Sequence, residues 1–180
     1  ALMSRGLGDV YKRQILGGNV VTAKPIGIHD GVDYLHSGTV RRVDAEGVRG
    51  ILDQDAIALL SPLGYSPAGE IFSVSASEVA EKVAVAIGAD KLIFLDRQPG
   101  LHAADGELIR QCTIDSAWAL DIVDAEQQRL RDSACRSCTN GVARSHLLSY
   151  EREGALLEEL FTHDGSGTLI AQNPYEQARS

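Results

Sequence analysis

The sequence lacks an apolar run of about 18 residues or more, the length that a membrane-spanning helix needs. Near its start it also lacks a positively charged stretch followed by a hydrophobic segment, the pattern of a secretory signal. A basic stripe for binding phosphates is absent too. The chain has 17 lysines and arginines but 25 aspartates and glutamates, which gives a formal net charge of −8. These absences predict a cytoplasmic protein that binds neither membrane nor nucleic acid.

The sequence has only three cysteines, and this odd number excludes a complete disulfide framework within the chain. Cys135 and Cys138 form a C-x-x-C pair, but structural zinc normally takes four ligands, and no second cysteine pair or closely spaced histidine pair is present. The five histidines, His146 among them, are therefore interpreted as surface or loop residues. Two interpretations of the pair stay open: small residues on a solvated loop or helix start, or a zinc or redox site.

Length and composition fit one globular domain, with 180 residues of which 44% are apolar and 23% charged. The first 14 residues show neither helical nor strand periodicity. Within them, residues 4–14 (SRGLGDVYKRQ) resemble the in-frame translation of a sequencing-library adaptor. We therefore predict that residues 1–14 are not native and that the domain occupies residues 15–172.

The first part of the domain is expected to form a β-ribbon. Apolar residues over 20–25 predict a strand, and residues 27–31 a turn. Strands over 32–35 and 39–43 would then form a hairpin around residues 36–38, because Gly38 can supply the positive backbone angle of a turn.

The next part predicts a βαβ unit. Asp44 can cap a helix over 44–53, and an uninterrupted apolar run over 56–60 indicates a strand buried on both faces. A helix capped by Ser77 and ended by Gly88 would lead to a second buried strand over 91–95. Such a unit belongs to an open parallel sheet, whose ligand crevice lies beyond the carboxyl ends of the strands.

The last part is expected to contain two helices and a strand. Helical spacing covers residues 116–131 and again residues 153–161, and a polar segment with the C-x-x-C pair separates them. A glycine-containing turn over 165–168 then precedes a strand over 169–171.

Three segments carry a family resemblance: GALLEELFTHDGSGT over 154–168, KPIGIHDGVDYLHSGTVRRVD over 24–44 and HLLSYEREGALLEELF over 146–161. The first resembles the corresponding segment of N-acetylglutamate synthases and arginine-inhibited acetylglutamate kinases. The second is similar to the synthase version rather than the kinase version, and the third points the same way. The similarity extends from about residue 19 to residue 170. It implies part of an amino acid kinase-like fold: an α/β domain with an open, mainly parallel sheet flanked by helices, and a β-hairpin. Residues 173–180 would begin a linker to an acetyltransferase domain.

The 154–168 segment has its own chemical content. Glu159 lies near the end of an amphipathic helix, and Gly165, Ser166 and Gly167 form a turn whose amides can converge on an anion. Free arginine suits both, since its guanidinium matches a carboxylate and its α-carboxylate matches amide donors. The other interpretation is that Glu158 and Glu159 form a solvated helix face and that the glycines only turn the chain.

The resemblance implies an arginine-binding site in this segment. It implies that Glu159 holds the guanidinium and that Lys91 and the turn line the pocket. The implied site residues are Glu159, Lys91, Gly165, Ser166, Gly167 and Thr168, with neither a catalytic residue nor a metal ligand among them.

Two segments distinguish a synthase from a kinase. Acetylglutamate kinases carry Asn-x-Asn-Ala-Asp where this chain has Ser73, Ser75 and Ser77, and a serine cannot supply the charge that orients groups around transferring phosphates. The residues LDRQPG, 95–100, replace the Thr-Asp that follows this strand in kinases. Kinase activity is therefore not expected.

The resemblance thus implies a fragment of an enzyme that transfers an acetyl group from acetyl-CoA to L-glutamate, the first step of arginine biosynthesis. This part would be its regulatory domain, with L-arginine as effector, and the family habit implies a homo-oligomer. Without the acetyl-CoA site, the fragment should use no cofactor and catalyse nothing alone. The alternatives are an acetylglutamate kinase and a non-catalytic arginine-binding module.

Overall fold

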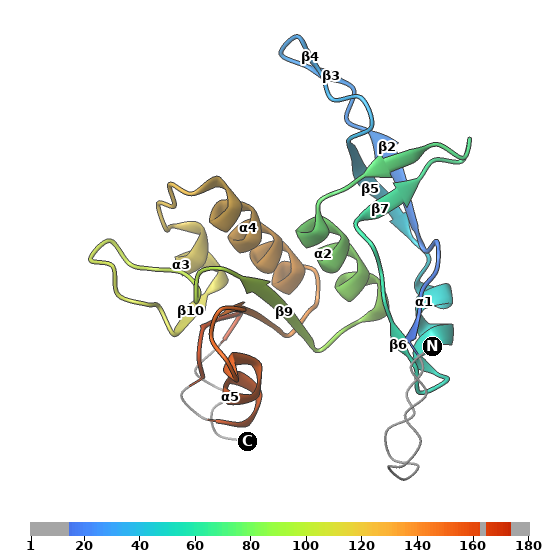
Figure 1. Cartoon of the computed structure of the whole chain (residues 1–180). Coiled ribbons are helices and arrows are strands. Elements are labelled where there is room, and N and C mark those ends of the chain that lie inside the picture. The colour runs from blue at the N-terminus through green and yellow to red at the C-terminus, as the bar shows by residue number, and fades with distance from the viewer. Residues whose placement is uncertain (1–14, 163–164, 174–180) are drawn as a thin grey trace. The chain divides into compact units, whose positions relative to one another are not determined.

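The computed structural model describes residues 15–162 and 165–173, and the predicted adaptor segment lies outside them. The chain divides into two compact units between Val74 and Ser75. Each unit has its own four-stranded sheet (Figure 1). Among the described helices, none is long and apolar enough to cross a membrane.

The first unit contains a four-stranded sheet with the strand order β5-β2-β7-β8. Strand β2 pairs antiparallel with β5 and parallel with β7, and β7 pairs antiparallel with β8. The strands of this sheet are β2 (Val21–Pro25), β5 (Gly38–Val43), β7 (Leu63–Tyr65) and β8 (Ile71–Ser73). The unit also contains β1 (Ile15–Leu16), β3 (Ile28–His29), β4 (Val32–Asp33), β6 (Ile57–Ala58) and helix α1 (Ala45–Leu52).

The predicted β-ribbon exists, but its predicted pairing is wrong. The hairpin joins β3 to β4 across Asp30 and Gly31, whose φ angles of 51° and 78° suit a two-residue turn. Gly38 is not a turn residue but the first residue of β5, where a side chain would lie 2.7 Å from Cβ of Phe72 and 2.9 Å from the carbonyl of Lys24. Close strand packing, rather than backbone conformation, therefore explains this glycine.

The predicted βαβ unit is also wrong in its connections. The apolar run over 56–60 gives only the two-residue strand β6, in which Ile57 is 46% exposed, so it is not buried on both faces. Strand β6 pairs in parallel with β1, and helix α2 (Ala76–Ile87) follows β8 instead. The apolar composition of the run was therefore a poor guide to its burial.

The helix caps agree better with the sequence. Asp44 caps α1 as predicted, since its Oδ1 accepts a hydrogen bond of 3.1 Å from the amide of Gly47. Gly88 ends α2 with a φ of 68°, also as predicted. The start of α2 is corrected, because Ser75 is the N-cap and Ser77 lies inside the helix.

The second unit carries a four-stranded sheet in the order β10-β12-β11-β9, and two of its three pairings are parallel. Helices α2 and α4 pack on one face, where the buried core includes Leu92, Phe94 and Leu147, and α5 contacts β11 (Figure 1). The predicted α/β class with helices flanking an open sheet is confirmed. The elements after α2 are β9 (Lys91–Asp96), β10 (Gln111–Thr113), α3 (Ile114–Trp118), α4 (Ala125–Thr139), β11 (Arg144–Ser149), α5 (Ala155–Phe161) and β12 (Thr168–Ala171).

The single helix predicted over 116–131 is in fact two. Asp124 starts α4 by accepting hydrogen bonds from the amides of Glu126 and Gln127, at 3.0 and 2.8 Å. The buried Arg131 of α4 donates to two carbonyl oxygens, that of Ala117 in the last turn of α3 and that of Leu120 just after it. These bonds satisfy the end of α3 and fix the break between the helices.

The three cysteines lie in the core, so the interpretation of Cys135 and Cys138 as solvated residues is wrong. Both are in α4, facing the sheet that contains Cys112 on β10. Burial raises the pKa of Cys112 to about 11, with a further contribution from Cys138. Burial likewise raises the pKa of Cys135 to about 12. Within the described residues, no three His, Cys, Asp or Glu side chains are grouped to hold a metal ion.

We expect these thiols to resist alkylation in the folded chain at neutral pH, because the reactive thiolate is suppressed and access is blocked. Thiolates form more readily in the unfolded chain, so the free energy of unfolding should fall as pH rises from the ordinary thiol pKa of 9.0 toward about 11 to 12. Iodoacetamide labelling and urea titrations across this range measure both effects. Labelling in concentrated urea is the control, and rapid labelling of the folded chain would contradict the prediction.

Candidate functional site

The central feature of the site is a hydrogen bond between a histidine of β11 and a glutamate of α5. Oε1 of Glu159 lies 2.7 Å from Nδ1 of His146, and the side chains are only 6% and 7% exposed. Helix α5 begins after Gly154, which has a φ of 76° and so allows the chain to turn back over β11. A surface carboxylate would not be so enclosed, and the interpretation of Glu159 as part of a solvated helix face is wrong.

The other oxygen of Glu159 is held by the backbone. Oε2 accepts hydrogen bonds from the amides of Ser166 and Gly167, at 2.6 and 3.2 Å, and we call these two N–H groups the amide nest. Gly165 precedes them with a φ of 62°, and a side chain there would come within 2.6 Å of Oε2. Glycine is therefore required for the amides to converge on the carboxylate.

The contacts determine the protonation of the pair. Burial alone raises the pKa of Glu159, but hydrogen bonds from His146 and the nest, together with the attraction of His146, lower it below its ordinary value of 4.5. The ionised carboxylate accepts only, so Nδ1 of His146 carries the proton. The second ring nitrogen, Nε2, is buried and has no hydrogen-bond partner within the described part of the chain. A polar group of a ligand would satisfy it.

The structure brings most of the predicted residues together. Glu159, Gly165, Ser166 and Gly167 form one connected group, with the carboxylate of Glu159 seated in the amide nest. Thr168 follows them directly in the chain and begins β12.

The remaining two predicted residues, Thr168 and Lys91, form no hydrogen bond to Glu159 that the structure records. Oγ1 of Thr168 accepts a hydrogen bond from the amide of Leu101 at 2.8 Å and donates one to the carbonyl of Ile109 at 2.6 Å. These two bonds fix the end of the turn to the segment between β9 and β10. Lys91 is exposed at the start of β9, two residues before Ile93, which is in register with His146.

His146 is the residue that the sequence interpretation placed wrongly. It lies on β11, 6% exposed, rather than on the surface or in a loop. Its position 13 residues before Glu159 gives no local signal, because the two meet only when α5 folds back over the strand. The one available clue was its place beside the apolar pair Leu147 and Leu148.

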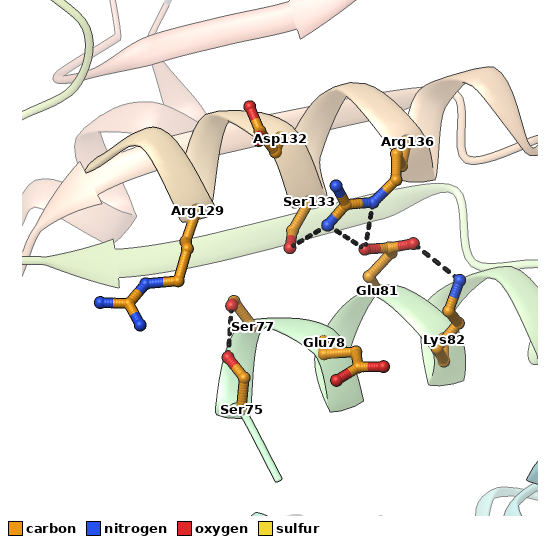
Figure 2. A pocket seen from close by; sticks show the side chains of 9 residues that line it. All are labelled: Ser75, Ser77, Glu78, Glu81, Lys82, Arg129, Asp132, Ser133 and Arg136. Atoms are coloured by element: carbon orange, nitrogen blue, oxygen red, sulfur yellow. Dashed lines mark hydrogen bonds and ion pairs between the residues drawn. The ribbon is translucent and has the colours of Figure 1, made fainter. Parts of the chain in front are cut away.

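A cavity of about 270 Å³ lies between α2 and α4, at the segment used to distinguish kinase from synthase (Figure 2). Ser75 Oγ is 2.8 Å from Ser77 Oγ at one side. Glu81, 1% exposed, accepts 3.0 Å hydrogen bonds from Arg136 and Lys82. The charges balance, since the lining holds the acids Glu78, Glu81 and Asp132 and the bases Lys82, Arg129 and Arg136.

A second cavity, of about 590 Å³, opens at the carboxyl end of β9. This is the edge at which the sequence predicts the ligand crevice. Three residues of the LDRQPG segment contribute to it. Its lining residues are Asp96, Arg97, Gln98, His102, Asp124, Glu126 and Gln127.

Comparison with known proteins agrees with the predicted resemblance. The chain is 49% identical to an amino-acid acetyltransferase of Azotobacter vinelandii over 168 residues, which cover 92% of this chain and 39% of that protein. N-acetylglutamate synthase from Neisseria gonorrhoeae, complexed with coenzyme A and L-arginine, superposes with a TM-score of 0.86 and 34% identity, covering 94% of this chain and 40% of that chain. The same synthase with coenzyme A and N-acetyl-glutamate gives 0.86 and 36%, covering 89% and 38%.

These relatives are much longer than this chain, which spans about two fifths of their length. The pattern of the amino acid kinase family matches residues 8–148, which is most of the 180 residues. The predicted kinase-like fold is thereby confirmed: the chain belongs to the amino acid kinase family.

Proposed function

We propose that this chain is the arginine-sensing, kinase-like part of an N-acetylglutamate synthase. The whole protein would transfer the acetyl group of acetyl-CoA to the α-amine of L-glutamate in the cytoplasm, as the first step of arginine biosynthesis. The observation that carries the proposal is the 49% identity to an amino-acid acetyltransferase over 92% of the chain. Acetyl-CoA would bind outside this fragment, and the protein would be a homo-oligomer.

The geometry around Glu159 supports L-arginine as the effector. A buried carboxylate matches the planar guanidinium, and the amide nest of Ser166 and Gly167 matches an α-carboxylate. The buried and unpartnered Nε2 of His146 adds a position for a polar group of the ligand. An amino acid with a cationic side chain is the ligand class that uses all three.

The other predicted residues would shape this site. Gly165 admits the convergence of the amides, and Thr168 fixes the turn through its two hydrogen bonds. Lys91 would approach the ligand from the start of β9. Sensing then requires that arginine bind two states of the enzyme unequally.

Kinase activity is the less favoured candidate. The serines of the 73–77 segment bring no carboxylate, and the acidic Glu81 in the neighbouring cavity is already engaged by Arg136 and Lys82. Phosphoryl transfer depends on charges placed around the transferring group. The cavity in Figure 2 is lined by three acidic and three basic side chains, so it has no excess of charge of either sign to place around a transferring phosphate.

Calorimetric titration of L-arginine into the chain tests the arginine site. We expect one site with a dissociation constant below about 1 mM, since roughly 4 kcal/mol is a modest demand for two charged contacts. L-citrulline, which replaces the guanidinium by a neutral urea group, should bind at least about tenfold more weakly. Absence of binding, or equal binding of citrulline, would contradict the proposal. An assay of acetyl transfer to glutamate by the complete gene product tests the parent activity.

A further inference from the structure

We propose that Glu159 is an internal ligand of the amide nest, and that an amino acid ligand binds by displacing its carboxylate from the N–H groups of Ser166 and Gly167. The inference rests on the proposed arginine site and adds how that site opens. It makes the nest a carboxylate-binding site whose occupant changes between two states.

The hydrogen bonds of Glu159 show why displacement is needed. Its Oε2 takes both nest amides, and its Oε1 takes Nδ1 of His146. The donors that suit an α-carboxylate are therefore used by a carboxylate of the protein. A guanidinium in turn would have to share carboxylate oxygens that these contacts already engage. The α-carboxylate of an amino acid cannot take its place on the amides until Glu159 turns away.

When the ligand displaces Glu159, each hydrogen bond that is broken would be replaced by one of the same kind. The ligand α-carboxylate would take the amides of Ser166 and Gly167, and the oxygens of Glu159 would turn to the ligand guanidinium. Because an ionised acceptor replaces an ionised acceptor, the nest is not left unsatisfied. The buried Nε2 of His146 would gain a hydrogen-bond partner that it lacks among the described residues. The carboxylate of Glu159 thus stabilises the site when no ligand is bound. A ligand must bind the two amides strongly enough to displace it.

The nest does not depend on Glu159 for its shape. Ser166 Oγ donates to the carbonyl of Ala155 at 2.8 Å, and Thr168 Oγ1 bonds to Leu101 and Ile109. Gly167 packs directly against the carbonyl of Leu147. These contacts hold the turn without using the carboxylate of Glu159. When Glu159 leaves, its two amides should remain in place and ready for another anion.

Chemical rescue of a Glu159→Ala chain tests the proposal. Formate should fill the vacated nest, with an affinity on the order of 1 mM for so small an anion. At about 100 mM formate, the thermal midpoint of the variant should rise by roughly 5 °C. The unmodified chain and Glu158→Ala should not respond, since Glu158 lies on the same helix but pairs at the surface with Arg152. The same thermal midpoints measured in an equal concentration of sodium chloride control for ionic strength.

A fold-preserving variant extends the test. Glu159→Gln keeps the size of the side chain but weakens its hold on the amides, so formate should produce a smaller midpoint shift of the same sign. Formate rescue without arginine binding would support the nest and remove the arginine assignment. Arginine binding to the unmodified chain, with no formate effect in either folded variant, would overturn the displacement and leave the proposed function standing.

Discussion

A Gly167→Ala chain is expected to lose roughly 4 kcal/mol or more of its unfolding free energy, a large share of the 5–15 kcal/mol typical of a domain. An added Cβ would overlap the carbonyl oxygen of Leu147, lie 2.6 Å from Cδ2 of Leu148 and lie 2.9 Å from the carbonyl of Pro99. Two of these neighbours are backbone atoms, which cannot move aside as a flexible side chain can. The turn would have to leave β11, and arginine binding should be lost with it.

Gly154→Ala is the matched control for this substitution. Gly154 also precedes a structural element of the second unit, and its φ of 76° is unfavourable for alanine, but nothing lies within 4 Å of an added Cβ. Its cost should therefore be limited to about 1–2 kcal/mol of backbone strain. Urea unfolding of the three chains measures both values. Equal losses in the two variants would show that steric overlap at Gly167 is relieved.

The local part of the site could be predicted from the sequence, because helix, turn and strand follow one another within a few residues. Glu159 and the amide nest are only seven and eight residues apart. The carboxylate and the glycine turn therefore meet without any long-range contact. What the sequence could not give was the depth of burial, which depends on α5 folding back over β11.

Strand β11 shows why the rest was hidden. Its residues Ser145, His146 and Ser149 are polar and yet buried, so neither alternation nor an apolar run marks the strand. Each finds a specific partner instead. Ser145 bonds to the hydroxyl of Ser137, His146 to the carboxylate of Glu159, and Ser149 to the carbonyl of Arg97. Such partners exist only in the folded unit. The exposed run over 56–60 is the converse case, in which apolar residues did not predict burial.

The turn also connects the site to the loop that follows β9. Gly100 has a φ of 147°, and a side chain there would overlap Oγ1 of Thr168, which in turn bonds the amide of Leu101. The LDRQPG segment is thus packed against the residues that carry the amide nest. Asp96, Arg97 and Gln98 of this loop line the larger cavity. The residues of the proposed arginine site are thus packed against the loop that lines this cavity.

Replacing Glu159 by alanine should destabilise the chain by about 3–5 kcal/mol at neutral pH and reduce arginine affinity at least about a hundredfold, because His146 and two buried amides lose a charged partner. The stability effect should depend on pH in one direction. The folded pKa of Glu159 lies below 4.5, so its contribution is fully present above pH 4.5 and is lost as pH falls through that lowered pKa.

Urea unfolding of the unmodified and Glu159→Ala chains at neutral pH and below pH 4.5 measures this dependence. The difference between the two chains should shrink on the acid side, since protonation removes the same charge that the substitution removes. Glu158→Ala, whose carboxylate pairs with Arg152 nearer the solvent, should cost less than about 1 kcal/mol. A difference that stayed constant across the acid range would assign the loss of stability to packing alone, and the charge of the carboxylate would then contribute nothing to the free energy of unfolding.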